Sequence, residues 1–232
     1  MTGIAGVTVI HRASPNHEPR PAATRVDMLV LHYTGMQNAE AALTRLCDPA
    51  SGVSAHYLVD EDGAVYALVA EDRRAWHAGV SCWRGHRDVN GRSIGVELVN
   101  PGHAFGYRPF PAAQMEALSR LAQGIVARHP IAPRNVVGHS DVAPLRKMDP
   151  GELFDWRWLA GHGVGLWPQP AAAPIAESAA SLLRTWGYDV PDAEAEHAAL
   201  VAFQRHFRPA RCDGVADAET LSLLHALARL VA

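Results

Sequence analysis

Apolar residues recur along this chain in two spacings, and the spacings predict its secondary structure. Ile94, Val96 and Leu98 alternate with small or polar residues, which is the period-two pattern of a strand that buries one face. A short apolar run of strand length covers residues 28–31, within a predicted strand at 26–31. The Asp-Gly step at 62–63 separates two further apolar runs and predicts a β-hairpin. Short strands are expected at 26–31, 57–59, 64–69, 93–99 and 136–137.

Helical spacing appears in the segments between these strands. Residues 39–46 carry an apolar side behind Asn38, which is a good N-cap residue, and residues 111–129 form the longest predicted helix. Residues 71–92 show little periodicity and predict a long functional loop. Residues 1–24, with three prolines between positions 15 and 21, predict an extended lead-in that wraps the domain or stays loose.

The C-terminal quarter of the chain has a different organisation. Three prolines between Trp167 and Pro174 predict a semi-rigid linker at residues 168–174. Three short amphipathic helices follow at 175–232, the last with Asp217 as its N-cap and the first ended by Gly187. We therefore expect an α/β fold of the α+β type: a mixed central β-sheet flanked by helices at 25–167, plus a small C-terminal three-helix domain.

Composition narrows the class of partner. The 232 residues are 48% hydrophobic and carry a formal net charge of -3, so cores can form and nothing indicates nucleic acid or a membrane surface as partner. No stretch is long enough for a transmembrane segment. Cys47, Cys82 and Cys212 are scattered and predict free thiols. We expect a monomer.

The N-terminal residues bear on the compartment. Residues 1–23 lack the apolar core of a secretory signal, so the expectation is a cytoplasmic protein. The alternative is the periplasm or cell envelope, if the sequence lacks a leader.

Candidate chemistry is concentrated at residues 138–151, a segment bounded by glycines. It holds His139, Lys147 and Asp149, and imidazole and carboxylate are both zinc ligands. The ammonium group of Lys147 is able to point at the group that the metal polarises. His32 follows a predicted strand directly and is the third candidate ligand, since rigid strands position such groups well. The alternative for His32 is a packed or surface histidine at a strand end.

Five sequence blocks resemble the type 2 family of zinc-dependent N-acetylmuramoyl-L-alanine amidases, and they occur in the family's order. The blocks are Leu-His-Tyr-Thr (31–34), Val-Ser-Ala-His-Tyr (53–57), Ala-Trp-His-Ala-Gly (75–79), Ser-Ile-Gly-Val-Glu-Leu-Val-Asn (93–100) and Gly-His-Ser-Asp-Val-Ala-Pro (138–144). A small departure is Met148, where many members carry threonine.

The resemblance implies roles for five residues. It implies His32, His139 and Asp149 as ligands of one Zn²⁺ per chain, and Glu97 and Lys147 as catalytic groups. Taken alone, Glu97 would be read as a solvated glutamate on a sheet surface. The chemistry needs such a group, because attack of water on an amide requires a base that takes a proton and later returns it to the nitrogen.

Three further residues are candidates for contact with substrate. Trp76 and His77 lie in a block that the family has beside its zinc, although Trp76 is equally explained as a core residue, and Tyr57 lies in the second block. His56, its neighbour, is instead explained by hydrogen bonds to backbone and is left out of the ligand set.

The C-terminal helices resemble the peptidoglycan-binding domain that is often fused to cell-wall hydrolases. Leu-Arg-Thr-Trp-Gly-Tyr (183–188), Phe-Gln-Arg-His-Phe (203–207) and Asp-Gly-Val-Ala-Asp-Ala-Glu-Thr (213–220) carry this looser resemblance. The alternative is a helical appendage that only stabilises the main domain.

The expected function is hydrolysis of the amide between N-acetylmuramic acid, or its anhydro form, and L-alanine of peptidoglycan stem peptides, in cell-wall turnover or recycling. The expected partners are peptidoglycan or muropeptide fragments. One alternative is a recognition module that binds muropeptides without cleaving them, and another is a metallohydrolase of the same fold that cleaves a different amide. The sequence leaves open whether intact wall or anhydro-muropeptide is preferred.

Overall fold

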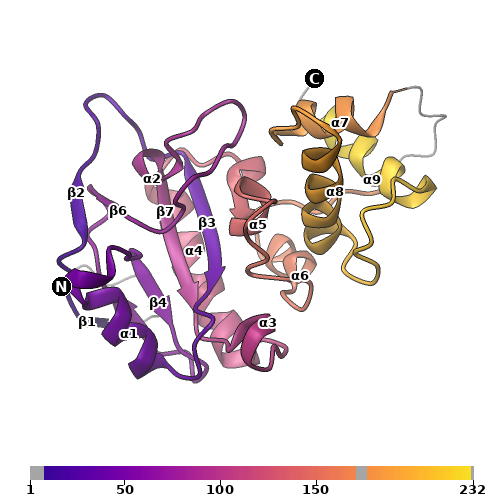
Figure 1. Cartoon of the computed structure of the whole chain (residues 1–232). Helices are drawn as coiled ribbons and strands as arrows, with labels where there is room; N and C mark the ends of the chain where they lie inside the picture. The colour runs from indigo at the N-terminus through magenta and orange to yellow at the C-terminus, as the bar shows by residue number, and fades with distance from the viewer. Residues whose placement is uncertain (1–7, 171–176, 231–232) are drawn as a thin grey trace.

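A six-stranded mixed sheet forms the centre of the computed structural model, which describes residues 8–170 and 177–230 (Figure 1). The strand order is β1-β5-β4-β7-β3-β8; β4, β7, β3 and β8 run parallel to one another, and β5 is antiparallel to β4. The mixed sheet and the hairpin are thus confirmed. The strands are β1 (Val9–His11), β3 (Met28–Tyr33), β4 (Tyr57–Val59), β5 (Val65–Ala67), β7 (Ser93–Leu98) and β8 (Val136–Gly138).

The helices flank this sheet, and the longer ones agree with the predictions. Asn38 and Asp217 cap their helices with side-chain oxygens, as expected. The helices are α1 (Ala39–Cys47), α2 (Val89–Arg92), α3 (Gly102–Phe105), α4 (Ala112–Arg128), α5 (His139–Val142), α6 (Trp156–Gly161), α7 (Ala179–Trp186), α8 (Ala193–Phe207) and α9 (Ala218–Arg229), with 3-10 turns at Pro49–Ser51 and Pro133–Asn135. Residues 171–174 of the predicted linker lie outside the described residues.

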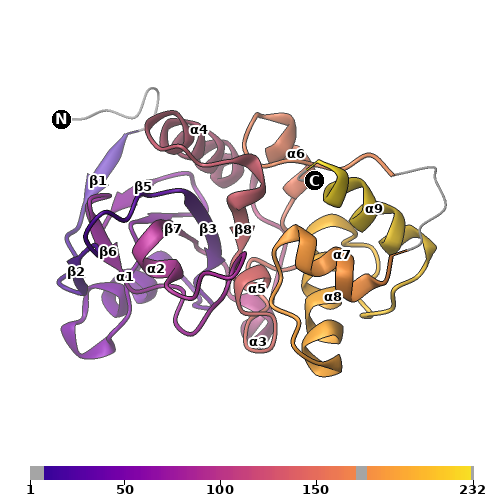
Figure 2. The same ribbon diagram turned by 90° about the horizontal axis from the view of Figure 1, so that it is seen from above.

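One face of the sheet is covered by α4. Leu29 and Leu31 of β3 and the alternating residues of β7 belong to one buried cluster with Leu118 and Leu121 of α4. The alternation of β7 predicted this face correctly. Figure 2 shows α4 along this side of the sheet, opposite α1.

The opposite face is covered at both ends and accessible between them. Leu58 of β4 packs with α1, while Met28 and Val30 of β3 share a second cluster with α7, α8 and α9. The C-terminal helices therefore lie beside β8 and α5 and share a core with the sheet (Figures 1 and 2). This arrangement leaves a cavity near the carboxyl ends of the parallel strands.

Two segments have more regular structure than predicted. The lead-in supplies β1, which pairs with β5, and β2 (His17–Pro19), which pairs with β6 (Arg73–Ala75) inside the expected loop 71–92. That loop also contains α2. These elements have three or four residues, too few to show a period. Their stability comes from partners distant in sequence: Arg20, for example, donates to the carbonyls of Glu71, Asn90, Gly91 and Ser93.

Within the residues that the structure describes, no helix is long and apolar enough to cross a membrane.

Candidate metal centre and active site

Strand register brings the candidate residues into one row at the accessible face. His32 of β3 pairs with Glu97 of β7, so the two side chains lie side by side on the face opposite α4. Leu31 pairs with Gly138 of β8, and His139 follows that strand at once. The parallel strands thus place three functional groups at the carboxyl ends of the sheet, where ligand sites of such sheets normally lie.

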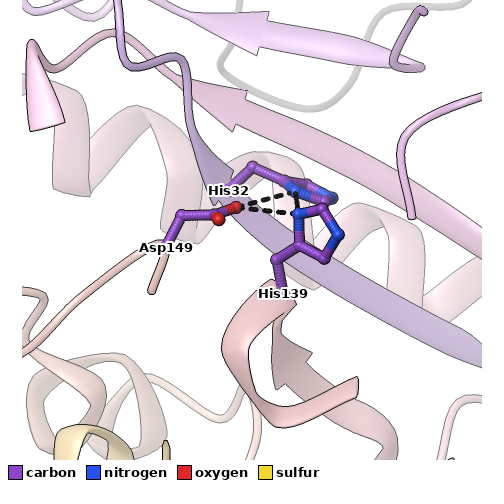
Figure 3. Close-up of side chains that lie close together, drawn as sticks. All are labelled: His32, His139 and Asp149. Carbon is purple, nitrogen blue, oxygen red and sulfur yellow. Dashed lines mark hydrogen bonds and ion pairs between the residues drawn. The ribbon is translucent and has the colours of Figure 1, made fainter. Parts of the chain in front are cut away.

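His32, His139 and Asp149 converge through three donor atoms (Figure 3). The Nδ1 atoms of the two histidines are 3.0 Å apart, and Oδ2 of Asp149 lies 3.0 Å from His32 Nδ1 and 3.1 Å from His139 Nδ1. All three residues are buried, being 1%, 4% and 6% exposed. The structure therefore brings together the three residues that the sequence proposed as ligands.

The second nitrogen of His139 indicates which nitrogen carries the proton. Nε2 lies 3.0 Å from the carbonyl oxygen of Ala78, which only accepts, so Nε2 is protonated and donates. In the tautomer that carries its proton on Nε2, Nδ1 presents its lone pair to the cluster.

A chain of hydrogen bonds fixes which nitrogen of His32 carries the proton. The hydroxyl of Ser93 donates to the carbonyl of Val89 and accepts from Nε2–H of His77, so that His77 Nδ1 carries a lone pair. This lone pair accepts from Nε2–H of His32 at 3.0 Å. His32 Nδ1 therefore also faces the cluster without a proton.

The pKa shifts in the cluster favour neutral His32 and neutral His77 beside a carboxylate. Burial and the neighbouring His139 lower the pKa of His32 to about 4, although Asp149 opposes the shift. Burial and His32 lower the pKa of His77 well below its ordinary value. Burial alone would raise the pKa of Asp149, but His139 and His32 outweigh it and hold that pKa below its ordinary range.

The donor set fits a zinc ion. Zinc binds imidazole nitrogen and carboxylate oxygen at about 2.0–2.2 Å in a tetrahedron, which places neighbouring ligand atoms about 3.3 Å apart. The three separations of 3.0–3.1 Å are close to that value. Three protein ligands leave the fourth position for water or substrate, as in catalytic rather than structural zinc sites.

Glu97 is not a solvated surface glutamate. Its Oε2 is buried and has no hydrogen-bond partner among the described residues. Burial and the charge of Asp149 raise the pKa of Glu97 well above its ordinary value, while Lys147 acts in the opposite direction. A half-buried glutamate with one buried, unpaired oxygen, beside a candidate metal centre, is able to exchange a proton with a bound reactant.

A cavity of about 390 Å³ contains this cluster. His32, Glu97, His139, Lys147 and Asp149 all line it, so the catalytic and metal candidates share one space. α1 forms another wall. The remaining lining residues are Tyr33, Thr34, Gly35, Met36, Ala42, Arg45, Leu46, Val53, Ser54, Trp76, His77, Arg146 and Met148.

The three substrate candidates separate in the structure. Trp76 and His77 line the cavity, but both nitrogens of His77 are engaged by His32 and Ser93. Tyr57 lies in a different pocket, where its hydroxyl donates to Glu71. Tyr57 is therefore left out of the site proposed below, because β4 directs this side chain away from the row that contains His32.

His56 has the structural role expected for it. Its Nδ1 accepts from the backbone N–H of Gly95, and its Nε2 lies 3.1 Å from the carbonyl of Arg73. Ser93, which completes the chain of hydrogen bonds behind His32, was not among the residues predicted from the sequence. A signal was available, because Ser93, Gly95 and Glu97 follow the period of two that puts them on one face.

Comparison with known proteins gives a consistent result. Residues 22–152 match the family model described as N-acetylmuramoyl-L-alanine amidase. The N-acetylmuramoyl-L-alanine amidase AmiD of Escherichia coli K12 is 39% identical over 244 residues, which cover 94% of this chain and 87% of AmiD. The 1,6-anhydro-N-acetylmuramyl-L-alanine amidase AmpD of Enterobacter cloacae is 37% identical over 163 residues, or 63% of this chain and 85% of AmpD.

Solved structures agree over most of the chain. The complex of E. coli AmiD with the substrate anhydro-N-acetylmuramic acid-L-Ala-D-γ-Glu-L-Lys has a TM-score of 0.81 and covers 94% of this chain and 93% of that one. AMPDH3 of Pseudomonas aeruginosa, in complex with anhydromuramic pentapeptide, is 36% identical with the same TM-score, covering 90% and 94%. Both similarities include residues beyond those that match the family model.

Proposed function

Since the chain belongs to the N-acetylmuramoyl-L-alanine amidase family and is an enzyme of that class, we propose that it acts with one zinc ion held by His32, His139 and Asp149. The convergence of three buried donor atoms, with both histidine Nδ1 lone pairs facing inward, is the observation that carries this proposal. Zinc bound there supplies a Lewis acid that polarises the amide carbonyl and acidifies water.

Glu97 acts as general base and then general acid. It takes a proton from water as the water oxygen bonds to the amide carbon, and it returns a proton to the nitrogen as the carbon–nitrogen bond breaks. The products are the carboxylate of the lactyl group and the free amine of L-alanine. Its place beside His32 in the sheet register supports this role.

Lys147 stabilises the negative charge that develops on the carbonyl oxygen. It lines the same cavity as Glu97 and lies two residues from Asp149, so its ammonium group is held near the reacting centre. A fixed cation stabilises negative charge more strongly in a partly enclosed site than in water. Trp76 lines the cavity wall and is proposed to contact substrate.

We propose an anhydro-muropeptide as substrate. The AmiD and AMPDH3 complexes contain anhydromuramic peptides, and both proteins cover nearly the whole of this chain. The test is mass spectrometry of anhydro-muropeptide and of intact sacculi after incubation with the protein. Preferential release of stem peptide from the fragment is expected; faster release from sacculi would overturn this preference.

Zinc dependence is tested separately. Inductively coupled plasma mass spectrometry should find one zinc per chain in the wild type and little in His139→Ala, while His197→Ala, at an exposed position on α8, keeps the metal. Chelation should abolish peptide release and added zinc should restore it. Release that persists in fully chelated protein would contradict the proposal.

We also propose that residues 177–230 bind peptidoglycan, on the strength of the motifs at 183–188, 203–207 and 213–220. Co-sedimentation of Asp149→Ala protein with purified sacculi tests this without hydrolysis. Absence of co-sedimentation would leave the helices with a purely structural role.

A further inference from the structure

The short helix α5, which begins with the candidate ligand His139, is held by a buried carboxylate. Asp141 is 2% exposed, and its Oδ2 accepts from the backbone N–H of Gly138 at 2.7 Å. The hydroxyl of Tyr188 donates to Oδ1 at 2.5 Å, and Nδ1 of His206 donates to Oδ2 at 2.8 Å. Two of these three donors belong to the C-terminal helical unit, residues 177–230.

His206 also packs against the segment that follows the ligand loop, which is the segment 138–151 that carries His139 and Asp149. Its ring stacks on Trp156, with centroids 3.8 Å apart and planes 16° from parallel. It also stacks on the ring of Phe207, the next residue of α8. Trp156 in turn lies against Gly138, where an added Cβ would meet the indole at 3.3 Å and Pro150 at 2.7 Å. The α8 side chain is thus close to both ends of the loop that carries His139 and Asp149.

The two ligand segments are joined directly. The backbone N–H of Ser140 donates to the carbonyl of Asp149 at 2.9 Å, so a shift of α5 changes the position of Asp149 as well as that of His139. Asp141 fixes α5 at its start. A buried carboxylate that loses a donor is costly, and the neighbouring backbone adjusts to recover a partner.

We propose that Tyr188 and His206 are positioning residues for the metal centre, so that the C-terminal helices brace the ligand loop in addition to any binding role. The inference rests on the proposed zinc site. The C-terminal helices, which lie outside the residues matched by the family model, thus contribute to metal binding.

The test is the zinc Kd of purified full-length variants, measured by competition with a chelator of known affinity. Tyr188→Phe keeps the ring against Trp83 and removes only the hydroxyl donor, and His206→Leu removes the other donor. Each should raise the zinc Kd by about 10-fold, which is the size of effect seen when groups behind metal ligands are removed. His206→Asn retains an amide donor near the position of Nδ1 and should restore much of the affinity.

Two controls separate positioning from loss of stability. His197→Leu changes an exposed histidine of the same helix and should leave the zinc Kd unchanged. Phe203→Leu disturbs the buried core of the helices without touching Asp141, so it should lower Tm but keep the zinc Kd. The inference is overturned if Tyr188→Phe and His206→Leu stay within twofold of the wild type, or if Phe203→Leu weakens zinc binding equally. A wild type that binds no zinc would instead refute the zinc site itself.

Discussion

At the scale of single residues, the site depends on atoms that do not touch the metal position. His77 receives a hydrogen bond from His32 and donates one to Ser93, so its orientation decides which nitrogen of His32 faces the cluster. This differs from a contact with substrate, which the sequence block suggested. Metal-binding histidines generally need such a partner for the nitrogen that does not bind metal.

Replacing His77 by alanine should therefore weaken zinc binding. The N–H of His32 would lose its acceptor, and both tautomers of His32 would become accessible. We expect a zinc Kd that is about 10- to 100-fold higher, measured by chelator competition. Trp76→Phe, in the neighbouring position, is the matched control and should keep the wild-type Kd. Unchanged zinc affinity in His77→Ala would contradict the role given to this residue.

Glu97→Gln separates catalysis from metal binding. The amide has almost the same shape but takes no proton from water, so kcat should fall on the order of 10²-fold or more while zinc content stays at one per chain. Stopped assays with anhydro-muropeptide measure the rate. Glu61→Gln, at the hairpin turn, is the control. Wild-type turnover in Glu97→Gln would remove Glu97 from the mechanism.

At the scale of elements, β7 supplies one face to the core and the other to the site. Ile94, Val96 and Leu98 contact the α4 side, whereas Ser93, Gly95 and Glu97 face the cluster. Gly95 is required by space: a Cβ there would lie 2.5 Å from the ring of His77. The strand β7 therefore carries Glu97 for proton transfer, Ser93 at the end of the hydrogen-bond chain behind His32, and Gly95, which leaves space for the ring of His77.

Gly95→Ala should disturb both stability and metal binding. The added methyl group has to displace a buried ring whose two nitrogens are hydrogen-bonded, so we expect a loss of about 1–3 kcal/mol in the free energy of unfolding together with weaker zinc binding. Denaturant titration of chelated protein gives the first quantity and chelator competition the second. Gly161→Ala, in α6 with open space around it, should change neither by a comparable amount. A stable, fully metal-binding Gly95→Ala would show that His77 has room to move.

The longer elements were predictable because each has its own period, but the short ones were not. α4 and β7 show an apolar face over several residues, and the sequence places them to within one or two positions. β2 and β6 contain three residues each and pair with each other, while Arg20, next to β2, donates to the carbonyls of Glu71 and Ser93. No local pattern carries that information.

At the scale of the whole molecule, the C-terminal helices and the sheet share buried surface. Met28 and Val30 of β3 belong to the same cluster as Leu183, Trp186 and Phe203. A unit of this size buries only a modest apolar area on its own, so contact with the sheet adds to its stability. The predicted linker does not separate two independent cores.

Distant parts of the main domain are also joined by an ion-pair cluster around Glu71. Arg128 and His129 at the end of α4 and Tyr57 of β4 all donate to this carboxylate, at 2.7, 2.7 and 2.8 Å. Burial alone would raise the pKa of Glu71, but these three donors outweigh it and lower the pKa to about 2 from 4.5. The fold therefore favours the charged form.

This shift predicts a contribution to acid stability. A pKa that is lower in the folded state stabilises the protein above about pH 4.5, and the contribution is lost as the pH falls from 4.5 to 2. Glu71→Gln should reduce the drop in unfolding free energy over this range by on the order of 2 kcal/mol. Denaturant titration of chelated protein at several pH values measures it, with the exposed Glu116→Gln as control. Identical pH profiles for Glu71→Gln and wild type would contradict the assignment.

The order of amino acids was enough to indicate which side chains share a face of each longer element. The alternation in β7 and the apolar run before His32 were sufficient to predict those two strands, and His32 with the ligand-type residues at 139–149 indicated the three candidate ligands. The surroundings of these residues follow from the folded arrangement: His77 lies behind His32, Tyr57 lies away from the cavity, and Tyr188 and His206 donate to Asp141. The physical reason is that periodicity reflects burial of each element's own side chains, whereas hydrogen-bond partners far apart in the sequence are set by strand register and by the packing of one element on another.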